Sequence, residues 1–169
     1  MQTTPTRTAL RFGLIVGLGL IIYGLILQVA KLQTNALASW GSTLFLIIGL
    51  IFAMQDYKKN NEGYLTYGEG LTIGSLTSAI AGFMSGLFTF VYISFIDNSF
   101  VDETLQKLRI DLEKQGQLTD DQIDKVIEMS AYMLKPGVLF ALGVVFTLIF
   151  GFVFSLIISA ILKKNKPVF

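Results

Sequence analysis

Four long apolar stretches dominate this sequence and restrict the fold it can adopt. A bilayer core about 30 Å thick is crossed by roughly 20 apolar residues in a helix, and none of the four stretches contains a charged residue. Barrel strands would be about ten residues long with alternating polarity. Because lipid offers no partner for backbone N–H and C=O groups, the stretches are predicted to be transmembrane helices. They cover residues 12–30, 37–54, 71–96 and 138–162.

The composition agrees with an all-α, polytopic membrane protein and argues against several functional classes. Hydrophobic residues make up 53 % of the chain and charged residues 15 %, whereas soluble domains carry about 25 % charged residues. A net charge of +1 does not indicate nucleic-acid binding. With no cysteine and no histidine, the sequence predicts no cofactor, no metal site built on these residues and no Ser-His-Asp triad.

The first stretch also resembles a signal peptide, since Arg7 and Arg11 precede it and Ala36-Leu37-Ala38 has the form of a cleavage site. However, it is longer than the usual apolar region of about 7–15 residues, and Ala36 lies well beyond its end. We therefore expect it to be a retained transmembrane helix.

Basic residues predict how the chain faces the membrane. Four spans place both termini on one side, together with the loop between spans two and three. Basic residues next to a membrane favour the cytoplasm, so both termini are expected there. The opposite side has Lys31 and five basic residues of the 97–137 segment. The seven basic residues on the expected cytoplasmic side are Arg7, Arg11, Lys58, Lys59, Lys163, Lys164 and Lys166.

The 97–137 segment is predicted to form an acidic helical hairpin outside the membrane, because it carries nine acidic and five basic residues. Ser99 and Asp102 have the spacing of a capping box, as do Thr119 and Gln122. Gly116 is predicted to end the first helix, and Pro136-Gly137 to break the chain before span four.

An apolar stripe runs along both predicted helices of this hairpin. It could pack between the two helices, lie on the bilayer or receive a partner. The first alternative is favoured. The stripe comprises Val101, Leu105, Leu108, Leu112, Ile123, Val126, Ile127 and Met133.

Small residues recur at intervals of four in the longer spans. Such faces let helix backbones approach closely and drive association in lipid. We expect them to close the four-helix bundle or to join two copies of it; lining a pore or allowing helices to slide is the alternative. The predicted packing residues are Gly70, Gly74, Ser78, Gly82 and Gly86 in span three, Gly143, Thr147, Gly151, Ser155 and Ser159 in span four, and Gly13, Gly17 and Gly24 in span one.

Three polar residues near the spans are candidates for function. Glu69 lies at the start of span three, where a carboxylate is stabilised by the helix dipole and free N–H groups. That structural role is favoured; the alternative is a proton or cation ligand. Tyr67 suits the headgroup zone. Gln28 is the strongly polar residue of span one, and the lack of ionisable residues inside the spans argues against proton- or sodium-coupled transport.

Several segments together resemble the domain of unknown function 4199 family of bacterial four-span membrane proteins. The resemblance extends from Pro5 to Lys164, and it implies an inner-membrane protein of a Gram-negative bacterium with the same layout of spans and hairpin. It implies no activity and no catalytic residues. The segments are Tyr57-Lys58, Gly63-Tyr64-Leu65-Thr66-Tyr67-Gly68-Glu69, Tyr92-Ile93-Ser94-Phe95-Ile96-Asp97, Leu118-Thr119-Asp120-Asp121-Gln122-Ile123 and Lys135-Pro136-Gly137.

We expect a non-enzymatic structural or accessory subunit whose partners are membrane lipids and either a second copy or another membrane protein. A small oligomeric transporter for a neutral solute is the alternative. An enzyme using Glu69 or the hairpin carboxylates for acid–base chemistry ranks last, because paired carboxylates at membrane depth are absent from the sequence.

Overall fold

The computed structural model describes residues 4–30, 32, 36–97 and 99–167, which are almost entirely helical and contain no strand. Lys31 lies outside the described residues. The chain divides into two compact units, the first comprising Met1–Ser85 with Gly143–Phe169 and the second Gly86–Leu142. The second unit contains the predicted hairpin and the adjoining ends of two spans. A single membrane domain with an insertion at 97–137 stays a prediction.

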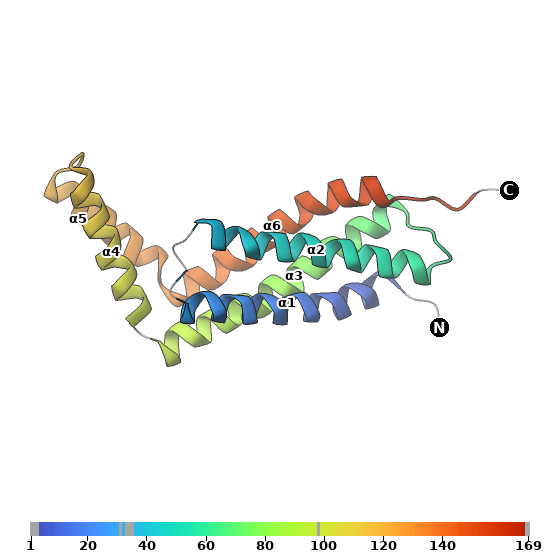
Figure 1. The fold of residues 1–169 in the computed structure, drawn as a ribbon, viewed down its shortest axis with the longest axis horizontal. Helices are drawn as coiled ribbons and strands as arrows, with labels where there is room; N and C mark the ends of the chain where they lie inside the picture. Colours follow the sequence, from blue (N-terminus) through green and yellow to red (C-terminus); the bar gives the residue numbers. More distant parts are fainter. Residues whose placement is uncertain (1–3, 31, 33–35, 98, 168–169) are drawn as a thin grey trace. The chain divides into compact units, whose positions relative to one another are not determined.

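The four predicted spans are confirmed as helices long and apolar enough to cross a membrane, and Figure 1 shows them as the long ribbons. Each begins before its predicted start, because residues outside the apolar stretch also adopt helical structure. Before the first helix, the Thr4 side chain accepts a hydrogen bond from the Arg7 backbone N–H at 3.3 Å. The helices are α1 (Pro5–Val29), α2 (Ala36–Asn60), α3 (Tyr67–Val91) and α6 (Pro136–Leu162).

Span three ends in a π turn that the sequence analysis did not predict. This turn, η1 (Tyr92–Ile96), continues α3. The Asp97 N–H donates to the Tyr92 carbonyl at 2.9 Å, which is the five-residue spacing of a π helix.

Within the first unit, α3 and α6 interlock through their small residues in a constant antiparallel register. A Cβ atom built on any of the four glycines in this register would come within 3.0 Å of a side-chain atom of the facing residue. Each step of four residues along α3 is matched by a step of four back along α6. The glycine–partner pairs are Gly70 with Ser159, Gly74 with Ser155, Gly151 with Ser78, and Gly82 with Thr147.

The hydroxyls in this interface bond mainly to their own helices. Ser78 donates to the Gly74 carbonyl at 2.9 Å, and Ser155 donates to the Gly151 carbonyl at 2.5 Å. These residues are therefore small and satisfied without a partner across the interface. Ser159 is also buried, and its hydroxyl contacts the Met54 sulfur at 3.7 Å.

Other predicted small residues differ in their surroundings. On α1, Gly13 lies against Ile80 and Gly17 against Met84, so both hold α1 close to α3. Gly86, in the second unit, is buried. Gly24 and Gly143 do not follow the prediction, because no side chain of a neighbouring helix lies within 4 Å of a Cβ built on either. Open space surrounds them instead of a packed interface.

The second unit contains the predicted hairpin, formed by α4 (Ser99–Gln115) and α5 (Asp120–Met133). The predicted cap at Ser99 is wrong. Ser99 is already the first helical residue, and its hydroxyl donates to the Asp97 carboxylate at 2.7 Å. The charged Asp97 oxygen, which also accepts from the Ser99 N–H at 3.2 Å, is the stronger acceptor and takes the capping role.

The turn signals at Gly116 and Thr119 are confirmed, whereas Pro136-Gly137 does not itself form the predicted break. Gly116 follows α4 with φ +63°, a conformation that favours glycine. The Gln122 side chain accepts from the Thr119 N–H at 3.0 Å, as one half of a capping box requires. The break before span four falls at residues 134–135, and Pro136 is the first residue of α6.

The hairpin helices pack against each other and are tied by an ion pair between Arg109 and Asp124 at 2.6 Å. Ile123 is buried, whereas Met133, at the end of the predicted stripe, is exposed. The predicted packing between the two helices is therefore observed for Ile123, whereas Met133 does not take part in it.

Replacing Gly82 by isoleucine is expected to destabilise the bundle by about 1–3 kcal/mol, because the new side chain would collide with Thr147 across the α3–α6 interface. Thermal unfolding in detergent measures the effect. Gly143→Ile introduces the same residue in a transmembrane helix where the Cβ meets open space, and it serves as the control. Equal melting temperatures for the two variants would contradict the packing role of Gly82.

Candidate functional site

The strongest polar cluster of the first unit surrounds the start of α3. Thr66 precedes the helix, and Glu69 lies in its first turn. One carboxylate oxygen of Glu69, Oε2, accepts from the Thr66 N–H at 2.8 Å and from the Thr66 hydroxyl at 2.9 Å. The Glu69 N–H donates back to the Thr66 hydroxyl at 3.3 Å. These reciprocal bonds form a capping box, which satisfies groups that the helix itself leaves unpaired.

The second carboxylate oxygen of Glu69 is bound from another helix. The Tyr57 hydroxyl, near the end of α2, donates to Glu69 Oε1 at 2.8 Å. Tyr57 is only 3 % exposed, so removing this bond would leave a polar group with little access to water. The interaction fixes the end of α2 against the start of α3.

The loop between these helices also binds the chain that follows α6. Leu65 and Lys164 exchange two backbone hydrogen bonds, at 2.9 and 2.8 Å. Lys58 donates from Nζ to the Leu162 carbonyl at 2.8 Å, at a helix terminus where unpaired carbonyls attract cations. An exposed ion pair joins Lys166 to Glu62 at 2.9 Å.

A Schellman-type turn positions this loop. Gly63 donates from its N–H to the Lys58 carbonyl at 2.9 Å, which is the 6→1 bond of the motif. Both Glu62 (φ +55°) and Gly63 (φ +81°) have left-handed backbone conformations. The chain therefore reverses tightly after α2 and brings Leu65 beside the C-terminal segment.

The three candidate residues from the sequence do not form one site. Tyr67 is the first residue of α3 and is 40 % exposed, and its side chain makes no hydrogen bond or ion pair to another described residue. Gln28 is half-buried in the last turn of α1. Figure 1 shows this end of α1 at the opposite end of the first unit from the start of α3. Glu69 lies in a network of side-chain hydrogen bonds with Tyr57 and Thr66.

This geometry limits the chemistry available at Glu69. Both carboxylate oxygens already accept hydrogen bonds from the protein, and these three bonds use most of the roughly four acceptor sites of a carboxylate. Among the described residues, no three carboxylate, histidine or cysteine side chains are grouped as a metal site requires. The observed arrangement fits the structural role of Glu69.

The partners of Glu69 were not predicted from the sequence. The Thr66–Glu69 spacing is itself a capping-box signal and could have been read from the sequence. The part played by Tyr57 could not, because it depends on how α2 and α3 lie side by side.

A comparison with models of known protein families assigns the chain to a family. Residues 11–164 match the family described as a protein of unknown function, DUF4199. The chain belongs to this family. The resemblance drawn from the sequence is thereby confirmed for the family and its four-span layout. No curated protein and no solved structure matches the chain.

Replacing Tyr57 by phenylalanine, or Glu69 by glutamine, is expected to lower the free energy of unfolding by about 1 kcal/mol each, since phenylalanine removes the donor of the Tyr57–Glu69 hydrogen bond and glutamine replaces its charged acceptor by a neutral amide. The double variant should lose clearly less than the sum of the two. Unfolding in detergent provides these values. Tyr67→Phe removes a hydroxyl with no described partner and is the control. Strict additivity of Tyr57→Phe and Glu69→Gln would show that the hydrogen bond does not couple the two helices.

Proposed function

We propose that this multi-pass membrane protein is a non-enzymatic structural or accessory subunit, which acts through helix packing and through its acidic hairpin. One observation carries the proposal: α5 has a second apolar face that the hairpin itself does not cover. Met129, Tyr132 and Met133 are 64, 58 and 48 % exposed. Their spacing of three and four residues places them on neighbouring positions of one helix surface.

The position of this face in the chain indicates the kind of partner. The residues lie in the last turns of α5, directly before α6 enters the membrane. A partner that contacts them would therefore lie close to the bilayer surface, as a second membrane protein does. The hairpin segment carries more acidic than basic residues, which favours a partner with a basic surface.

Charge also supports a proposed orientation in the inner membrane. Seven of the thirteen basic residues lie near the two termini or in the last turn of α2, and such residues favour the cytoplasm. Both termini would then be cytoplasmic, and the hairpin would lie on the extracytoplasmic side. The inner membrane itself is an inference from the resemblance described above.

Single cysteines test the proposal cleanly, because the chain has none of its own. With Met129→Cys, crosslinking in native membranes is expected to give one stoichiometric foreign partner. The same partner should be lost when Tyr132 and Met133 are both replaced by serine in that background. Glu113→Cys, an exposed site on α4, is the control and should give much less of this product. Recovery of self-complexes alone from Met129→Cys would contradict the accessory role.

A cavity in the first unit favours one second candidate, a small permeation unit for a neutral solute. It has a volume of about 300 Å³, at the lower end of the range of small-molecule sites. Hydroxyl-bearing residues from three helices contribute to its lining, including Ser42, Thr43, Ser85 and Thr147.

Vesicles that contain only the purified protein separate the two candidates. As an accessory subunit, the protein should leave glycerol and urea entry at the rate of protein-free vesicles in a light-scattering assay. Entry accelerated several-fold, and reduced again by Ser42→Leu in the cavity wall, would favour permeation. Leu148→Phe, at an exposed position outside the cavity lining, controls for a general effect of altered transmembrane residues.

A further inference from the structure

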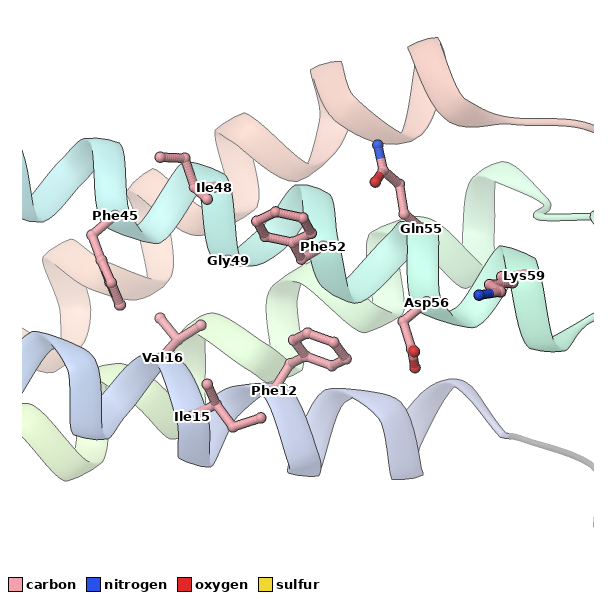
Figure 2. Close-up of a pocket in the computed structure, with 10 residues that line it drawn as sticks. All are labelled: Phe12, Ile15, Val16, Phe45, Ile48, Gly49, Phe52, Gln55, Asp56 and Lys59. Carbon is pink, nitrogen blue, oxygen red and sulfur yellow. The ribbon is translucent and has the colours of Figure 1, made fainter.

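A groove between α1 and α2 combines an apolar wall with one charged end. Its volume is about 450 Å³, a size typical of sites for small organic ligands. Figure 2 shows Phe12 of α1 and Phe52 of α2 across the gap from each other, with Asp56 and Lys59 at one end and Phe45 at the other.

The length of the groove matches one leaflet of a bilayer. Along α2 from Phe45 to Lys59 it extends roughly 21 Å at about 1.5 Å per residue. One leaflet, with its headgroup region included, is about 20–22 Å thick. With Lys59 among the lipid headgroups, Phe45 therefore lies near the bilayer midplane, and the apolar wall faces acyl chain throughout.

The charged end has unused hydrogen-bond donors. Arg11 lies there too: its guanidinium is 4.0 Å from the Asp56 carboxylate, beyond hydrogen-bond distance, and its side chain is 68 % exposed. Neither the Arg11 nor the Lys59 side chain makes a hydrogen bond to another described residue. Two cations against one carboxylate leave this end with a net positive charge.

From these features we propose that the α1–α2 groove binds one anionic phospholipid. An acyl chain lies along Phe12, Ile48 and Phe52, and the phosphate lies between Arg11 and Lys59, where guanidinium and ammonium groups both donate to phosphate oxygens. An anionic headgroup fits better than a zwitterionic one, because the single carboxylate at this end, Asp56, already faces Arg11.

Native mass spectrometry of the full chain in detergent, with added phosphatidylglycerol or phosphatidylethanolamine, tests the headgroup contact. The wild-type chain is expected to retain one phosphatidylglycerol in preference to phosphatidylethanolamine. Arg11→Gln with Lys59→Gln should weaken retention about 30-fold, since each basic residue near an anionic lipid contributes roughly fivefold. Lys163→Gln removes a charge at the same end of the bundle but outside the groove, and retention should stay unchanged.

A second pair of variants tests the acyl-chain contact. Ile48→Trp fills the groove and should reduce retention, whereas Ile157→Trp places the same side chain at an exposed position of α6 outside it. Melting curves in lipid-free detergent verify that each variant is folded. Equal retention of the two lipids, or retention unaffected by both groove changes, overturns the proposal.

Discussion

Hydrocarbon surroundings impose the constraint on which the rest of this structure depends: every backbone N–H and C=O group in the spans must find its partner within the protein. Helices meet this requirement, but lipid supplies little hydrophobic force to bring them together. Close contact must replace that force. In this chain the contact is the α3–α6 interface, where Gly74 faces Ser155 and Gly151 faces Ser78. Serine is tolerated there because its hydroxyl bonds to the preceding turn of its own helix, so close approach leaves no polar group unpaired.

At the end of the bundle where α2 and α3 meet, two polar arrangements differ in how completely they are satisfied. Around Glu69, both carboxylate oxygens have donors from Tyr57 and Thr66, and the cluster holds helix ends together. At the α1–α2 groove, Arg11 and Lys59 retain unused donors beside an apolar wall. A satisfied cluster contributes mainly stability, whereas unused charge next to an apolar surface is the arrangement that recognises a ligand. The groove, with its unused donors, is therefore better suited to bind a ligand than the Glu69 cluster is.

The hairpin differs from the transmembrane helices in composition and packing. Its helices are rich in charge, and an ion pair between Arg109 and Asp124 joins them, yet they bury little beyond Ile123. A small helical pair of this kind has little apolar area to stabilise it. Met129, Tyr132 and Met133 are nevertheless exposed. The hairpin therefore lacks the stabilisation that burying these side chains would give. The proposal of a partner rests on this exposure, which is independent of the packing inside the bundle.

The sequence by itself determined the four spans, the position of the hairpin, the turn at Gly116 and the capping box at Thr119. Each of these features depends on residues close together in the sequence. Local composition and the free-energy cost of unpaired backbone groups are enough to specify them. Only the tertiary structure decided that Gly82 has a close neighbour while Gly143 has none, and that the Tyr57 hydroxyl donates a hydrogen bond to Glu69. It also assigned the cap of α4 to Asp97 in place of Ser99. Those outcomes depend on the relative rotation of helices and on competition between nearby acceptors, and a periodic sequence pattern does not specify either.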